Sequence, residues 1–251
     1  MSRLQLPSSS GLRMDGRRHG ECRRVTCGMG VFHRAVDGSA SFELGQTKVL
    51  AAVYGPREAD RWGTTKHDRA ILSVEFTMSK FSGSERVKWS KGDRRSTIME
   101  NTLRQVFEPV IQMHLFPRSE VSIIVEIVQN DGGILPASIN CITLALIDAG
   151  IPIDDYVCAC SAGFIDTTPV LDLSWVERSV NGVEACVAML PVTGKVSLAE
   201  MESTLLADHF GTLITAAIDG CRQMHKAMKD YVRQHALNLL QVDEAGGHRQ
   251  S

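Results

Sequence analysis

The chain has 251 residues, of which 43% are apolar and 22% are charged. A chain of this length and composition can bury a core of its own, as one large domain or two small ones. It contains no apolar run near the ~20 residues that span a bilayer, and residues 1–7 lack the apolar segment of a secretory signal. We therefore expect a soluble intracellular protein rather than a membrane-spanning or secreted one.

The net charge of −2 hides a strong asymmetry between the two halves of the chain. Residues 1–118 hold 20 Lys and Arg against 12 Asp and Glu, whereas residues 119–251 hold 7 against 17. A basic half favours a surface that faces a polyanion. It is equally typical of an oligomer in which the basic face of one subunit meets the acidic face of the next.

The apolar pattern predicts one mixed α+β domain over residues 21–240, with helices covering sheets. A polar arm over 1–20 precedes it, and a flexible tail over 241–251 follows. In chain order we predict strands at 48–54 and 71–78, an amphipathic helix at 94–114, a buried strand at 121–128, an apolar helix at 137–149, strands at 157–165 and 185–190, and a long helix from Leu206 past Tyr231. Gly150 and Pro152 mark the end of the apolar helix.

The segment 86–95 is the first candidate site, because five of its ten residues are basic and Trp89 lies among them. Asp93 is placed to cap the helix that begins here, so Arg94 and Arg95 fall in its first turn. Cations there oppose the helix dipole. Their presence favours a phosphate-binding role, in which guanidinium groups stand beside the free N–H groups of the helix start. The alternative is an exposed basic loop that pairs with carboxylates of a neighbour.

The segment 57–69 is a second basic loop, and it carries Arg61, Lys66, Arg69 and the aromatic Trp62. Basic loops with an aromatic side chain suit single-stranded RNA, which offers phosphates and base faces for stacking. An ordinary exposed loop of mixed charge explains the same residues equally well.

Two further segments carry weaker signals. Gly132 and Gly133 allow a tight turn and a close backbone approach between a strand and a helix. The carboxylates of segment 166–172, with Glu177 and Glu184, suit Mg²⁺ at strand ends, although capping and turn roles are the favoured interpretation. The seven cysteines are scattered without a CxxC pair, so we expect small buried side chains and no metal site or cofactor.

Five segments, which span much of residues 10–238, together resemble the ribonuclease PH family, and within it the exosome-ring branch equivalent to the archaeal catalytic subunit. They are GLRMDGRR (11–18), GQTKVLAAVYGPRE (45–58), GDRRSTIMENTLRQVFEPVI (92–111), DGGILPASINCITLALIDAGIP (131–152) and DTTPVLDLSWVE (166–177).

The resemblance implies the ribonuclease PH-like (ribosomal protein S5 domain 2-like) α+β fold and a hetero-hexameric ring with S1/KH cap subunits. It also implies single-stranded RNA in a central channel and a location in the nucleus, nucleolus and cytoplasm. Active members of the family use phosphate to release nucleoside diphosphates from RNA 3′ ends.

The same resemblance implies a degenerate catalytic site. Active members carry a Gly-Ser/Thr-Arg turn where this chain has Ile134 and Leu135, whose side chains cannot donate to phosphate. They carry two aspartates where this chain has Arg178 and Glu184.

We therefore predict a non-catalytic ring subunit that threads RNA towards a separate hydrolytic subunit in RNA decay and ribosomal RNA maturation. The expected RNA-binding residues are Arg94, Arg95, Arg61, Lys66 and Arg69. One alternative is an active phosphate-dependent 3′–5′ exoribonuclease that uses Glu184 with Asp172 or Glu177. The other is a purely structural scaffold whose arginines pair with neighbouring subunits.

Overall fold

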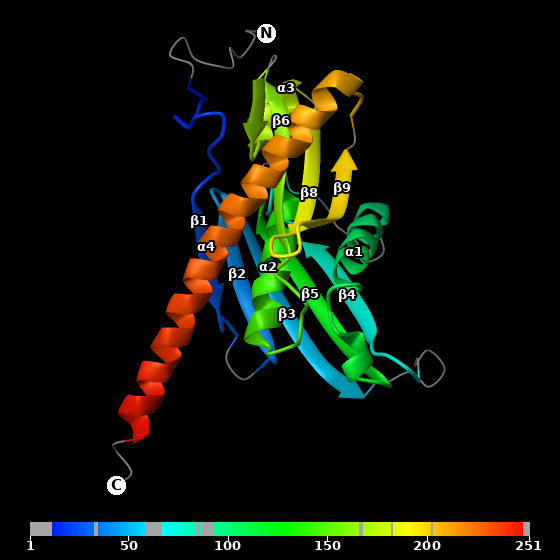
Figure 1. Ribbon diagram of the computed structural model, residues 1–251, viewed down its shortest axis with the longest axis vertical. Helices are drawn as coiled ribbons and strands as arrows, with labels where there is room; N and C mark the ends of the chain where they lie inside the picture. Colours follow the sequence, from blue (N-terminus) through cyan, green and yellow to red (C-terminus); the bar gives the residue numbers. More distant parts are fainter. Residues whose placement is uncertain are drawn as a thin grey trace.

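The computed structural model describes residues 12–32, 35–58, 67–83, 86, 93–165, 168–181, 183–201 and 203–247. They form two sheets with helices packed between and around them (Figure 1). The first sheet has the order β1-β2-β3-β5-β4, and the second has the order β7-β6-β8-β9. All strand pairs in these sheets are antiparallel except β4 and β5, which are parallel.

The bounds of the elements follow the chain. The first sheet contains β1 (Val25–Met29), β2 (Gly38–Leu44), β3 (Thr47–Glu58), β4 (Ile71–Met78) and β5 (Ser119–Gln129). The second contains β6 (Cys158–Ile165), β7 (Thr168–Leu171), β8 (Glu184–Leu190) and β9 (Lys195–Met201). The helices are α1 (Arg94–Phe107), the short η1 (Met113–Leu115), α2 (Ile134–Asp148), α3 (Trp175–Asn181) and α4 (Ala207–Gly247).

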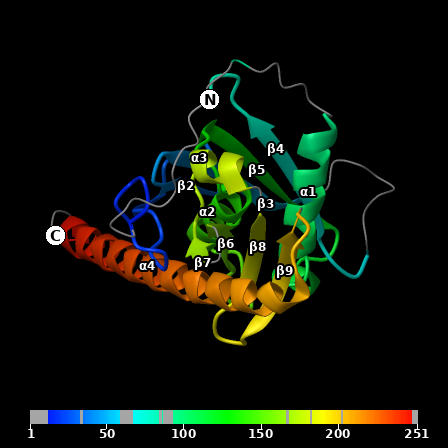
Figure 2. The ribbon, with the colours of Figure 1, turned by 90° about the horizontal axis from the view of Figure 1, so that it is seen from above.

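The core lies around α2, which contacts strands of both sheets. Eleven of its 15 residues are buried, as its nearly continuous apolar sequence requires. On the first sheet, β3 and β4 bury alternate residues, because only one face packs against the core. Every residue of β6 is buried, since α2 and α4 both pack against this central strand (Figure 2). None of the described helices is both long and apolar enough to cross a membrane.

The structure confirms the predicted α+β fold class and the predicted strands and helices, with differences at their ends. The first helix ends at Phe107 instead of residue 114, because Pro109 has no N–H to continue the hydrogen-bond ladder. Val110 and Ile111, which follow the helix, are still buried. Their apolar side chains extend the helical spacing in the sequence beyond the true end of the helix. The strands β1, β2, β7 and β9 and the short helix α3 were not predicted. The domain limits at residues 20 and 240 stay predictions.

A buried ion pair between Arg23 and Asp172 joins the segment before β1 to the second sheet. Asp172 Oδ2 accepts from Arg23 Nε at 2.8 Å, and Asp172 Oδ1 accepts from Nη2 at 2.7 Å. Both side chains are almost fully enclosed, with 6% and 1% exposed. The same guanidinium donates to the carbonyls of Asp131 at 2.7 Å and Gly132 at 3.2 Å. Arg23 therefore ties the β5–α2 turn to the loop before α3.

A second buried ion pair, between Arg13 and Glu177, holds α3. Arg13 Nε donates to Glu177 Oε1 at 2.8 Å, and Arg13 Nη2 donates to the carbonyl of Asp172 at 2.8 Å. Glu177 Oε2 also accepts from the backbone N–H of Ser174 at 2.9 Å, which forms a capping box at the start of α3. Asp172 and Glu177 thus stabilise the fold as ion-pair partners.

Replacing Arg23 with Ala is expected to lower the free energy of unfolding by about 3–5 kcal/mol, because it leaves the Asp172 carboxylate buried without its cation. Denaturant unfolding followed by circular dichroism measures the loss. The matched control is Arg222→Ala, which breaks an exposed pair with Asp219 and should change stability by less than about 0.5 kcal/mol. Equal effects of the two changes would contradict a structural role for the Arg23–Asp172 pair.

Candidate active site

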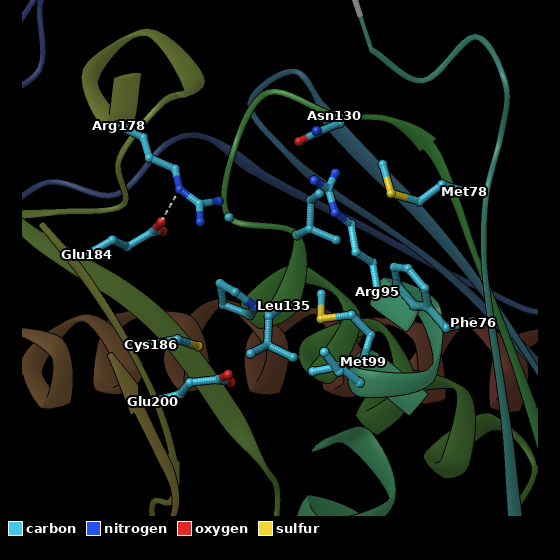
Figure 3. A pocket seen from close by; sticks show the side chains of 14 residues that line it. Phe76, Met78, Arg95, Met99, Asn130, Leu135, Arg178, Glu184, Cys186 and Glu200 are labelled. Carbon is cyan, nitrogen blue, oxygen red and sulfur yellow. Dashed lines mark ion pairs between the residues drawn. The ribbon is translucent and has the colours of Figure 1, made fainter. Parts of the chain in front are cut away.

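A pocket of about 540 Å³ lies where the start of α1, the β5–α2 turn and the edge of the second sheet converge. One wall carries Arg95 and Met99 from α1, and the opposite wall carries Arg178 from α3 and Glu184 from β8 (Figure 3). Ile134, Leu135 and Pro136, at the start of α2, supply apolar lining between these walls. The pocket therefore places charged groups of both signs beside an apolar surface.

Arg95 reaches the pocket because of its position in the first turn of α1. Arg94 and Arg95 are both exposed, but successive helix residues point about 100° apart, and only Arg95 lines the pocket. Asp93 occupies the N-cap position as predicted, although its side chain makes no capping hydrogen bond. Thr97 Oγ1 instead donates to the Asp93 carbonyl at 3.1 Å.

The β5–α2 turn requires glycine because of its positive φ angles and its close approach to neighbouring atoms. Gly132 has a φ of +85°, and a Cβ placed on it would lie 2.8 Å from the carbonyl oxygen of Leu173. Gly133 has a φ of +64°, and its Cβ would lie 3.0 Å from Arg23 Nη2. The predicted tight turn and close approach are confirmed. The turn brings Gly133 to the pocket and sets the direction in which α2 begins.

The acidic wall combines an ion pair with a second carboxylate. Arg178 Nε lies 3.0 Å from Glu184 Oε2, and the two side chains are 47% and 15% exposed. Glu200 on β9 lines the same pocket; its Cα pairs with that of Cys186. Since Glu184 lies two residues from Cys186, both carboxylates lie on one face of the sheet. Glu200 was not predicted, because its strand was missed.

The sequence-predicted residues divide into three groups. Arg95, Ile134, Leu135, Arg178 and Glu184 come together in the pocket. Arg94 and Arg69 do not line it, and Arg69 forms an exposed pair with Asp68 at 3.1 Å. Arg61 and Lys66 lie outside the described residues.

Asp172 and Glu177 are the carboxylates that the enzyme alternative proposed as helpers of Glu184. They do not line the pocket, because buried arginines hold both of them. Burial alone would raise the pKa of Glu177. Hydrogen bonds from Arg13 and Ser174 outweigh this effect and keep the pKa below its ordinary value. The carboxylate on the pocket wall beside Glu184 is therefore that of Glu200.

The cysteines fit their predicted role as buried side chains at five of seven positions, with Cys22 and Cys27 partly exposed. Burial raises the pKa of the Cys27 thiol to about 11 and that of Cys221 to about 12. In the part of the chain that the structure describes, no three His, Cys, Asp or Glu side chains gather as metal ligands.

Two models of the 3′ exoribonuclease family RNase PH match this chain, domain 1 over residues 21–152 and domain 2 over residues 155–220. The chain belongs to the ribonuclease PH family. The two family domains meet at the pocket, since Arg95 and the β5–α2 turn come from the first, whereas Arg178, Glu184 and Glu200 come from the second.

Relatives in this family match nearly the whole chain. The human exosome complex component RRP41 is 45% identical over 94% of this chain and 96% of its own length. The exosome complex component Rrp41 of Thermococcus kodakarensis is 39% identical over 96% of each chain. Among solved structures, rice Rrp46 has a TM-score of 0.78 at 24% identity, covering 88% of this chain and 100% of that one. This last likeness shows the shared fold.

The prediction of a non-catalytic ring subunit is wrong. The matches to the 3′ exoribonuclease family and to RRP41 components from eukaryotes and archaea fit the alternative better, an active exoribonuclease. The prediction counted Leu135 and Arg178 as two separate losses at aligned positions. In space both residues line one pocket. The β5–α2 turn has Leu135 in place of an arginine, and Arg178 brings a guanidinium to the same pocket from α3.

Arg95 and Arg94 form a matched pair for testing the pocket. Arg95→Ala is expected to weaken the binding of inorganic phosphate by about 10- to 100-fold, because a charge-assisted hydrogen bond is removed. Arg94→Ala should change it by less than about threefold, since Arg94 lies outside the pocket. Phosphorus NMR line broadening with the full chain measures both. Equal losses for the two variants would show that phosphate is held by general positive charge at the helix start.

Proposed function

We propose that this chain is an active phosphate-dependent 3′–5′ exoribonuclease and a ring subunit of an exosome. The observation that carries the proposal is one pocket in which Arg95 faces Arg178, Glu184 and Glu200 across an apolar lining. Membership of the 3′ exoribonuclease family and the relatives named as exosome components support the substrate and the assembly.

The reaction requires an attacking phosphate, a stabilised phosphorus centre and a proton for the leaving group. An oxygen of inorganic phosphate bonds to the phosphorus of the last phosphodiester. The bond from that phosphorus to the 3′ oxygen of the preceding nucleotide breaks, and the electron pair leaves with this oxygen. A proton then completes a 3′ hydroxyl on the shortened RNA, and the terminal nucleotide departs as a nucleoside diphosphate.

The pocket residues divide these tasks according to their chemistry. Arginines bind phosphate oxygens with several N–H donors and stabilise the negative charge that gathers on them during transfer. Glu200, on the wall opposite Arg95, is a carboxyl group that can deliver a proton to the leaving oxygen. Glu184 on the same wall is paired with Arg178. Ile134 and Leu135 offer an apolar surface against which the terminal nucleotide packs, which excludes water as a competing nucleophile.

The proposed assembly is a ring of related subunits around single-stranded RNA. The solved structures of similar fold include an archaeal exosome core and an Archaeoglobus fulgidus exosome "with RNA bound to the active site". Arg94 and Arg69, exposed outside the pocket, are proposed to hold the RNA backbone without sequence preference. Arg61 and Lys66 are proposed for the same role. S1/KH cap subunits, a separate hydrolytic subunit, a part in ribosomal RNA maturation and a nuclear, nucleolar and cytoplasmic location are further proposals from the family resemblance.

Phosphorolysis is tested with the chain reconstituted into a ring without any hydrolytic nuclease. With 3′-tailed single-stranded RNA, Mg²⁺ and phosphate, we expect nucleoside diphosphates as products, and no monophosphates when phosphate is left out. Glu200→Gln should lower kcat by about 10²- to 10⁴-fold, as expected for the loss of a general acid. Chromatography of the released nucleotides measures each rate.

The control variant is Glu43→Gln, which removes an exposed carboxylate paired with Lys48 in the first sheet, and it should leave kcat unchanged. Intact RNA in the presence of phosphate, with the ring assembled and RNA still bound, would contradict the proposed activity. Nucleoside monophosphates as products would instead indicate hydrolysis.

A further inference from the structure

We propose that Arg178 is a phosphate-binding side chain of this pocket, which faces Arg95 and supplies the guanidinium that the β5–α2 turn lacks. The inference deepens the proposed function, because it names a residue that handles the phosphate group. The ligand is a phosphate group carried by inorganic phosphate or by the terminal phosphodiester of RNA.

The position of Arg178 follows from the way α3 is held. Its neighbour Glu177 is buried against Arg13, and the backbone N–H of Arg178 donates to the Ser174 carbonyl at 3.0 Å. Successive side chains on a helix point about 100° apart. Fixing Glu177 towards the interior therefore turns Arg178 towards the pocket, where Figure 3 shows it reaching from the wall opposite Arg95.

Glu184 holds one edge of the Arg178 guanidinium. The ion pair joins Arg178 Nε to Glu184 Oε2 at 3.0 Å. A guanidinium has five N–H donors in a planar fork, so one arginine can hold a carboxylate on one edge and a phosphate on another. The side chain is about half exposed, at 47%, and can therefore meet a ligand that enters from solvent. Glu184 is thus a positioning residue for Arg178.

The two walls together give the pocket the chemistry of an anion site. Arg95 lies at the start of α1, where the helix dipole and the first backbone N–H groups favour negative charge. Leu135, at the turn, has an aliphatic side chain and cannot donate to phosphate. Arg178 adds the second positive charge from the other family domain. The competing interpretation treats Arg178 as a cation that blocks a site meant for a carboxylate.

The experiment compares Arg178→Gln, Arg178→Lys and Arg178→Asp in the reconstituted ring. We expect Arg178→Gln to raise the KM for the phosphate-bearing partner by about 10- to 100-fold, the factor for one charge-assisted hydrogen bond. Arg178→Lys keeps the charge but loses the planar fork, so it should recover only part of the affinity. Arg178→Asp should be the most impaired of the three, because it places a carboxylate against the phosphate.

The two sources of the phosphate group are distinguished by comparing the KM for inorganic phosphate with the KM for RNA. A rise in the KM for inorganic phosphate alone assigns Arg178 to the attacking phosphate, and a rise in the KM for RNA alone assigns it to the terminal phosphodiester. Both outcomes support the proposal. The matched control is Arg222→Gln, an exposed arginine that pairs with Asp219 at 2.8 Å, and it should change neither KM.

Phosphorus NMR of the same variants measures phosphate binding directly, without requiring RNA cleavage. Inorganic phosphate that binds the ring more weakly after Arg178→Gln supports the inference even if no RNA is cleaved. Unchanged phosphate and RNA binding in Arg178→Gln would overturn it. Faster cleavage in Arg178→Asp than in the unaltered chain would also overturn it, because the cation would then be an obstruction.

Discussion

The buried ion pair between Arg23 and Asp172 is the constraint on which the site depends. An arginine and an aspartate that are almost fully enclosed are stable only when each satisfies the other, and Arg23 also donates to the carbonyls of Asp131 and Gly132. One side chain therefore fixes the turn at the start of α2 and the loop that leads to α3. The turn leads into the apolar lining of the pocket, and the loop leads to the wall that carries Arg178, so the ion pair holds these two parts of the pocket together.

The pocket also gives a physical meaning to the charge asymmetry of the chain. The basic first half contributes Arg95, and the acidic second half contributes Glu184 and Glu200. Phosphate transfer needs positive charge around the phosphorus centre and a proton source beside the leaving oxygen. A site at the junction of the two halves can hold both kinds of group. Arg178 is the exception, since it brings positive charge from the acidic half.

Regular patterns in the sequence were sufficient to predict the elements that bury an entire face. The β5 and β6 strands, α2 with its stop at Gly150, and the start of α1 were predicted because apolar spacing and helix-end signals act locally. The strand Lys195–Met201 was missed because it is only partly buried along its length, so its apolar residues show no clear alternation. Glu200 was therefore not predicted as a site residue.

The sequence could not predict the long-range ion pairs. It also could not predict that an arginine on one helix reaches the space next to a turn that lacks one. Nothing local indicates that Arg23 meets Asp172 across 149 positions, so Asp172 and Glu177 were open to interpretation as catalytic carboxylates. The resemblance directed attention to Leu135 and Arg178, and the structure brings both into one pocket. It compared them one position at a time, however, and such a comparison cannot detect a guanidinium that reaches the same space from another helix.

The central claim is that this pocket binds a phosphate group between its two walls. The most direct test is an experimental structure of the reconstituted ring with 3′-tailed RNA and a phosphate mimic such as vanadate. The account predicts density for the mimic in contact with both Arg95 and Arg178, with the terminal nucleotide against Ile134 and Leu135. Density for the RNA 3′ end in the channel, with this pocket filled by water alone, would contradict it.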